Sequence, residues 1–147
     1  RILGDYSFGE NAWKYLDMMR ELCEEKGVKL ILIKAPSLYP YWYPEWEEQV
    51  EEYAQKYGLP YINFLELTEE TGIDYSTDTY DAGLHMNLSG AEKLARYMGR
   101  FLREEIGLLD RRGETELQEI WKGKIEAYEA EREAQYVKYG MKEENGQ

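Results

Sequence analysis

The sequence predicts an α/β fold with parallel strands, and two observations carry this prediction. Two short apolar runs, 28–34 and 59–64, each start directly after a glycine and have the length and composition of buried strands. Each run follows a helical pattern, 12–26 or 45–57, across a short connection. The order helix, strand, helix, strand is typical of parallel strands joined by crossover helices.

The first helix, predicted over 12–26, is amphipathic. Its apolar stripe comprises Ala12, Leu16, Met19 and Cys23. Asn11 is a candidate N-cap, and Gly27 follows the last basic residue, as is typical of a helix C-terminus. The single cysteine, Cys23, cannot form an intrachain disulfide, and its place in the stripe favours a packed thiol over a reactive one.

Three further helical segments are predicted. Pro44 suits the first turn of the helix at 45–57, and a short helical turn is expected near 67–71. The strongest pattern, 89–106, begins either with a capping box from Ser89 to Glu92 or with Asn87 as its cap.

A long charged helix is predicted over 115–139, with an apolar stripe that thins in its second half. Such a helix packs against the rest of its own chain at one end only, or it packs against a partner protein.

Two strands are few for a parallel sheet, which needs several strands and cover on both faces. We therefore expect either that the segments 1–8 and 74–80 add strands, or that the natural protein carries more chain before Arg1.

Composition restricts the partners. The 147-residue chain is 43% hydrophobic and 33% charged, which is typical of a folded globular protein. Its formal net charge of −12 argues against nucleic acid and against an anionic membrane surface, because both attract basic patches. No stretch of the sequence has the pattern of a signal peptide or a membrane span.

The only histidine, His85, is the candidate for acid–base chemistry. Imidazole side chains titrate near neutral pH, so they can accept a proton and return it. A carboxylate from Asp81 or Asp78 could orient the ring. The alternative is an ordinary surface histidine beside a helix N-terminus. A metal site is disfavoured, because one histidine and one cysteine offer no recognisable ligand spacing.

The loop after the first strand holds the other candidates. Ligands of parallel α/β sheets bind beyond the carboxyl ends of the strands, where we expect Lys34, Ser37 and the His85 loop to lie. The same loop is rich in aromatic residues, and Tyr41 and Trp42 could stack on a sugar ring or simply pack between helix and sheet. Ser37, Tyr41 and Trp42 are therefore the predicted substrate-binding residues.

The stretch "DTYDAGLHMNLSGAEKLARYMGRFL" resembles the C-terminal motif of the GDSL/SGNH hydrolase superfamily, in which the Asp and His of a Ser-His-Asp triad precede the last helix. The segments "NAWKYLDMMRELCEEKGVKLILIKAPS" and "DRRGETELQEIW" are similar to its bacterial branch, which includes cell-envelope O-acyltransferases and the D-alanyl transfer protein of lipoteichoic acid. The resemblance covers most of 11–121. It implies a flavodoxin-like three-layer sandwich with parallel strands, incomplete here, over 1–109, followed by a charged helix and tail over 110–147.

The resemblance implies a serine esterase or O-acyltransferase that acts on an acylated glycan, a cell-envelope polymer or a small ester, without metal or cofactor. His85 would be the general base and Asp81 its orienting acid, with Asp78 as second choice. The family often spaces these residues as Asp-x-x-His, which here would put the acid at Ala82. Asn87 would cap the last helix.

The nucleophilic serine is not evident. The family carries it in a Gly-Asp-Ser turn after a strand, whereas here Tyr6 interrupts "GDYSFGEN" and no apolar strand precedes Ser7. We expect the serine before Arg1, with Ser37 as an alternative within the chain. The resemblance also implies an extracytoplasmic bacterial protein with a membrane acyltransferase as partner. Two other hypotheses are a non-catalytic glycan-binding or scaffold module with a degenerate site, and an interaction protein that docks through its last helix.

Overall fold

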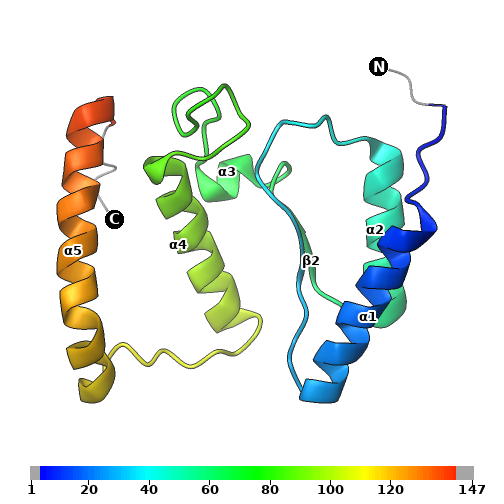
Figure 1. The fold of residues 1–147 in the computed structure, drawn as a ribbon, viewed down its shortest axis with the longest axis horizontal. Coiled ribbons are helices and arrows are strands. Elements are labelled where there is room, and N and C mark those ends of the chain that lie inside the picture. Colours follow the sequence, from blue (N-terminus) through cyan, green and yellow to red (C-terminus); the bar gives the residue numbers. More distant parts are fainter. Residues whose placement is uncertain (1–3, 142–147) are drawn as a thin grey trace. The chain divides into compact units, whose positions relative to one another are not determined.

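A computed structural model describes residues 4–141 (Figure 1). The chain divides into two compact units, and the boundary in the sequence lies between Glu66 and Leu67. The first unit contains α1 (Glu10–Lys26), β1 (Leu32–Lys34), α2 (Pro44–Tyr57) and β2 (Tyr61–Asn63). The second contains α3 (Thr68–Thr71), α4 (Leu88–Glu104) and α5 (Thr115–Tyr139).

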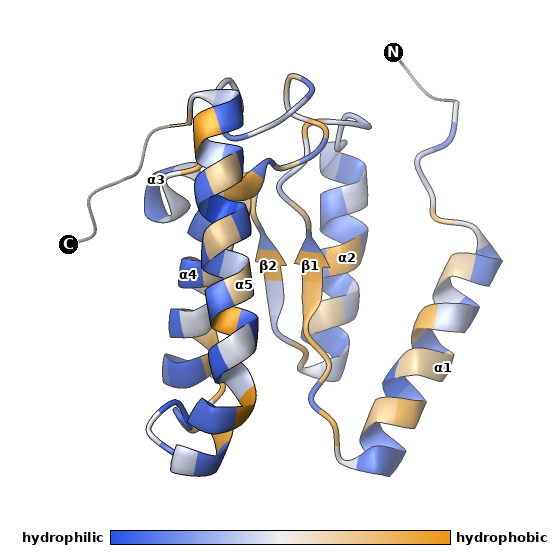
Figure 2. Ribbon diagram, turned by 60° about the vertical axis from the view of Figure 1, so that its left-hand side comes forward, coloured by the Kyte–Doolittle hydropathy of each residue, from blue (hydrophilic) through white to orange (hydrophobic). Residues whose placement is uncertain are grey.

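The first unit is built on two short parallel strands with α2 as the crossover between them. Leu32 pairs with Tyr61, and Lys34 pairs with Asn63. Figure 2 shows the two strands side by side and pointing in the same direction. The core of this unit includes Ile62 and Phe64, both nearly inaccessible to solvent, whereas Ile33 at the centre of β1 is exposed. The predicted parallel pairing is confirmed.

The helix ends of the structure agree closely with the ends predicted from the sequence. All predicted helices form, and their ends lie within two residues of the predicted ones. Pro44 occupies the first turn of α2, as predicted. Gly27 adopts φ 65°, a left-handed conformation that suits glycine and ends α1. Asn11 is not the N-cap of α1, because the helix already begins after Gly9, which offers no side-chain cap.

The predicted flavodoxin-like three-layer sandwich is wrong. Within residues 4–141 the only sheet has two strands of three residues each, and helices make up most of the rest. Residues 4–8 form no strand, and in 74–80 only Thr79 makes an isolated antiparallel bridge, to Met86. An apolar run in the sequence marks where a strand can form. A strand also needs a neighbouring strand for its backbone hydrogen bonds, and β1 has such a neighbour, β2, along only three residues.

In the second unit, α5 lies beside α4 (Figure 1) and is held to it through Glu92. The Glu92 carboxylate accepts hydrogen bonds from Arg132 Nε at 2.6 Å and from the hydroxyls of Tyr128 and Tyr136 at 2.9 Å. Burial acts to raise the pKa of Glu92, but these hydrogen bonds outweigh it and the pKa is lowered. The part of α5 that packs is therefore its polar second half, whereas Trp121 in its apolar first half is 52% exposed.

Gly90, in the first turn of α4, allows a close approach of the preceding loop. A Cβ atom added there would lie 2.4 Å from the backbone oxygen of Asp78 and 3.0 Å from Met86 Sδ. Gly99, on the same helix, has open space, because an added Cβ would meet no atom within 4 Å.

We expect Gly90→Ala to destabilise the fold by about 1–3 kcal/mol, because the backbone of Asp78 would have to move. Gly99→Ala is the matched control and should stabilise by about 0.5–1 kcal/mol through helix propensity alone. Urea unfolding of both variants measures the difference. Equal effects of the two substitutions would contradict the close approach.

Candidate functional site

A hairpin spanning 79–86 presents His85. Thr79 bridges Met86 across the base, and the backbone nitrogen of Tyr80 donates to the carbonyl of His85 at 3.0 Å. The Thr79 hydroxyl accepts from the backbone nitrogen of Gly83 at 2.8 Å. The tip turns through two left-handed residues, Ala82 with φ 56° and Gly83 with φ 104°. A left-handed alanine is costly, and such strain persists where surrounding bonds enforce it.

His85 and Asp81 form a pair. The Nδ1 atom of His85 lies 2.5 Å from Oδ2 of Asp81, and the backbone nitrogen of His85 donates to Oδ1 at 2.7 Å. The carboxylate accepts, so Nδ1 carries the proton and Nε2 is the basic nitrogen. The turn at Ala82 and Gly83 folds the chain back, which explains how an acid four residues before the histidine reaches its ring.

The pair is open to solvent. The side chain of His85 is 70% exposed and that of Asp81 is 39% exposed. Within the described residues, Nε2 of His85 has no hydrogen-bond partner, so a reacting hydroxyl could approach it. The hydrogen bonds from the His85 side chain and then from its backbone lower the pKa of Asp81. This carboxyl is therefore ionised throughout the neutral range.

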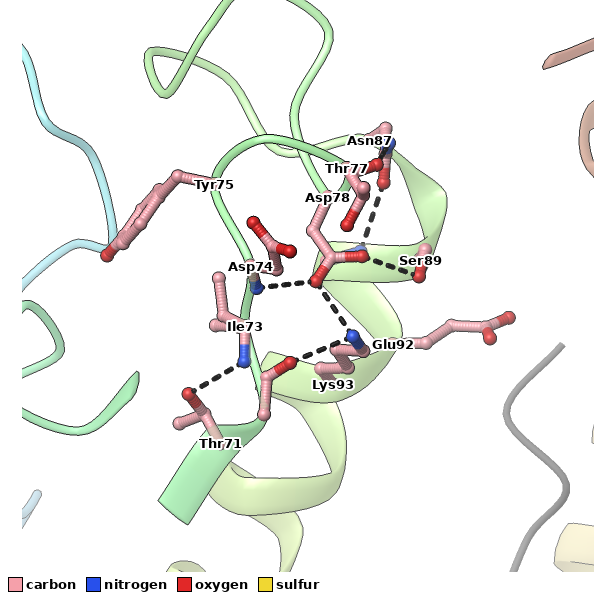
Figure 3. Close-up of polar contacts among 12 residues, drawn as sticks. Thr71, Ile73, Asp74, Tyr75, Thr77, Asp78, Asn87, Ser89, Glu92 and Lys93 are labelled. Atoms are coloured by element: carbon pink, nitrogen blue, oxygen red, sulfur yellow. Dashed lines mark hydrogen bonds and ion pairs between the residues drawn. The ribbon is translucent and has the colours of Figure 1, made fainter. Parts of the chain in front are cut away.

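Asp78 takes a different role. It is buried, and its Oδ1 accepts from the Ser89 hydroxyl while its Oδ2 accepts from the backbone nitrogen of Asp74 and from Lys93 Nζ, all at 2.8 Å (Figure 3). Lys93 Nζ also donates to the carbonyl of Gly72 at 2.8 Å. These donors occupy both oxygens of Asp78, so this aspartate holds the loop to α4 and does not orient His85.

Asn87 joins the hairpin to the helix. Its side-chain oxygen accepts from the backbone nitrogen of Gly90 at 3.1 Å, which makes it the N-cap of α4. Its Nδ2 donates to the carbonyl of Thr77 at 2.7 Å, and its backbone nitrogen donates to that of Asp78 at 2.9 Å. Of the two predicted caps, Asn87 is thus the one used, and Ser89 is engaged with Asp78 instead.

The predicted substrate-binding residues lie in the first unit, after β1. The Ser37 hydroxyl donates to the carbonyl of Tyr39 at 2.8 Å. Trp42 donates its indole N–H to Glu47, and Lys34 Nζ lies 5.5 Å from the centre of the Trp42 ring. Burial lowers the pKa of Lys34. Trp42 thus packs against its neighbours, which is the second of the two interpretations given above for the aromatic loop. Its role in substrate binding stays a prediction.

Tyr41 differs from Trp42, because its side chain is 64% exposed. Its ring lies edge-on to Tyr43, with the ring centres 4.9 Å apart, so its free face is accessible. A substrate-binding role for Tyr41 and for Ser37 stays a prediction.

Sequence reasoning missed Lys93 and Ser89. Their spacing of four residues puts them on one face of α4, and a buried lysine needs an anion, so the pattern could have indicated an acid partner. Both line an open cavity of about 790 Å³ together with hydroxyl-bearing residues of the loop and the end of α5. The members of that hydroxyl set are Ser76, Thr77, Thr79, Tyr80 and Tyr139.

The described residues contain neither a metal-binding cluster nor a membrane-spanning helix. Across 4–141, no group of three or more histidine, cysteine, aspartate or glutamate side chains is arranged to hold a metal ion. No helix in the same range combines the length and apolar character needed to cross a membrane.

Comparisons with family models, with curated proteins and with solved structures find no match to this chain. The resemblance to the GDSL/SGNH superfamily therefore stays an expectation from the sequence.

The Asp78–Lys93 pair gives a stability prediction. Asp78→Asn and Lys93→Met should each destabilise by about 3–5 kcal/mol, because each leaves the partner buried without its counter-charge. The double variant should lose much less than the sum, since no lone charge remains buried. Urea unfolding measures the cycle. Arg111→Met is the control, because its pair with Glu114 is exposed to solvent and should contribute little to the free energy of unfolding.

The His85–Asp81 pair gives a titration prediction. Because the pKa of Asp81 lies below its ordinary 3.8, pairing adds stability that is present above about pH 4 and is lost as the pH falls through the folded-state pKa. In His85→Ala the pKa should rise toward 3.8, as followed by the carboxyl carbon shift in NMR. Asp74, whose pKa Ser76 holds low, is the internal control and should not change. An unchanged Asp81 pKa would contradict the pair.

Proposed function

We propose that His85 and Asp81 form the base half of a Ser-His-Asp acyl-transfer site, in a serine esterase or O-acyltransferase of the GDSL/SGNH type. The contact that carries the proposal is the 2.5 Å approach of His85 Nδ1 to Asp81, with the opposite ring nitrogen accessible. A surface histidine without a function needs neither a carboxylate on one nitrogen nor a strained turn to bring that carboxylate to it.

In this proposal each group has one role. Nε2 of His85 takes the proton from the serine hydroxyl as its oxygen attacks the ester carbonyl, and it then returns the proton to the leaving alcohol. Asp81 holds the tautomer with the proton on Nδ1 and stabilises the imidazolium that forms. Ser37 is the alternative for the nucleophilic serine within the chain. Asp78 takes no part in the proton transfer of this proposal and keeps the hairpin in place.

The substrate class follows from the resemblance alone. It is an acylated glycan, a cell-envelope polymer or a small ester, met outside the cytoplasm, with a membrane acyltransferase as partner. The resemblance suggests no cofactor.

A second candidate function rests on a separate observation. Tyr39 and Tyr41 are 57% and 64% exposed, which is unusual for two large rings so close in one loop. A non-catalytic module could use them to stack on sugar rings, with the histidine hairpin as a degenerate remnant.

The decisive experiment measures p-nitrophenyl acetate hydrolysis by the natural gene product. His85→Ala should reduce kcat by about 10³-fold or more, and Asp81→Asn should also reduce it strongly, because the imidazole loses its orienting acid. Leu84→Ala, a partly exposed neighbour on the same hairpin, is the matched control and should retain activity.

Wild-type turnover by His85→Ala would refute acyl transfer through this histidine. If the wild type lacks esterase activity and both it and His85→Ala bind the same polysaccharide, the glycan-binding module is the correct alternative.

A further inference from the structure

The cavity lined by the hydroxyl set lies between the base of the His85 hairpin, the start of α4 and the end of α5. Its volume of about 790 Å³ is in the range of small-molecule sites. Two further polar side chains, Asn87 and Ser89, line it as well. Neither His85 nor Asp81 is a lining residue, so any ligand of this cavity needs a separate account.

The charges of the cavity cancel. Its charged lining residues are Asp78 and Lys93, which form an ion pair at 2.8 Å with side chains that are 3% and 9% exposed (Figure 3). Asp78 accepts two further hydrogen bonds, and Lys93 Nζ also donates to the carbonyl of Gly72. An ionic ligand would therefore meet a counter-charge that is already paired, so the lining favours a neutral ligand.

The lining keeps hydrogen-bond donors that the protein does not use. Nδ2 of Asn87 carries two hydrogens, and within residues 4–141 its one hydrogen bond goes to the carbonyl of Thr77. Asn87 is only 6% exposed, so its second donor needs a partner from the cavity. The hydroxyl of Tyr139 makes no hydrogen bond to any of the described residues.

Other hydroxyl groups of the lining donate inward and can still accept. The Ser89 hydroxyl donates to Asp78 at 2.8 Å, and the Ser76 hydroxyl donates to Oδ1 of Asp74 at 2.6 Å. A hydroxyl oxygen has two lone pairs, so it can accept a hydrogen bond while its proton is engaged elsewhere. The cavity thus offers acceptors as well as donors to a ligand.

Two tyrosine rings give the cavity an apolar part. Tyr80 comes from the hairpin and Tyr139 from the end of α5, and their ring centres lie 5.7 Å apart in an edge-to-face arrangement. The two residues are 54% and 51% exposed. Lys138 Nζ lies 4.9 Å from the centre of the Tyr139 ring, so the ring pair is not enclosed on all sides by apolar groups.

We propose that this cavity binds the ring of a neutral sugar. Each sugar hydroxyl both donates and accepts, which matches the unused donors and the acceptor oxygens of the lining. The C–H groups of a sugar ring form an apolar surface that suits the tyrosine rings. Tyr80 donates its backbone N–H to the carbonyl of His85, so the sugar would lie against the hairpin that carries the histidine. Sugar binding is independent of acyl transfer, but a role as glycan subsite of that reaction rests on the proposed function.

An NMR titration of the backbone amides with glucose, galactose and mannose tests the proposal on this chain. At least one of these sugars should bind in the millimolar range and shift the amides of Thr77, Thr79 and Tyr80. Tyr139→Ala should weaken binding about fivefold or more, because it removes a ring contact and an unused donor. Tyr15→Ala, at a tyrosine of α1 that is 63% exposed, is the matched control and should leave binding within about twofold.

Three outcomes would overturn the proposal. One is the absence of saturable binding of all three sugars at about 100 mM. Another is an equal loss of binding in the two tyrosine variants, whose amide spectra also check that the fold is intact. The third is binding of glucuronate or glucosamine about tenfold tighter than that of the neutral sugars, which would mean that the cavity recognises a charge.

His85→Ala separates this proposal from acyl transfer. The variant should retain sugar binding, because His85 does not line the cavity. If the natural gene product hydrolyses p-nitrophenyl acetate and binds none of the sugars, the cavity proposal is wrong and acyl transfer stands. Sugar binding by a protein without hydrolytic activity would support the cavity and count against acyl transfer.

Discussion

The buried ion pair of Asp78 and Lys93 is the interaction that makes the second unit possible. Removing two charges from water is costly, and the cost is offset only when every remaining donor and acceptor is satisfied. Here the two carboxylate oxygens take three donors, and Lys93 Nζ has a carbonyl as its second partner. Because the backbone oxygen of Asp78 also accepts from Asn87, one residue fixes both the loop and the first turn of α4.

This arrangement separates two aspartates that look equivalent in the sequence. Asp78 is inaccessible and saturated with donors, so it can hold structure but cannot follow a reacting proton. The side chain of Asp81 is exposed on the hairpin, and its two oxygens accept from the ring and the backbone of His85. The hairpin is fixed where it joins α4 and exposed at its tip. This arrangement suits a general base, because the imidazole ring must be oriented and must still reach a substrate. The environment of each carboxylate, rather than its distance along the chain, sets its role.

The sequence was sufficient wherever structure depends on near neighbours. Periodicity and glycines such as Gly27 located the helices, and strand runs identified the parallel pair. The layered sandwich was wrong because the number of paired strands depends on contacts that no local pattern contains. The residues alone left Asp78 and Asp81 open as partners of His85, and only the resemblance favoured Asp81, because the left-handed turn at Ala82 has no signature in an alanine. The role of Lys93 required knowing which loop packs on α4.

α4 connects the hairpin to α5. Its N-terminus is fixed by Asn87 and by the ion pair, so the helix is held where the hairpin needs it. In the same part of the helix, the Glu92 carboxylate accepts hydrogen bonds from Arg132 and from two tyrosine hydroxyls, and all three donors belong to α5. Glu92 and Lys93 are adjacent in the sequence, so their side chains leave α4 on different sides. One turn of this helix therefore holds the loop through Lys93 and α5 through Glu92.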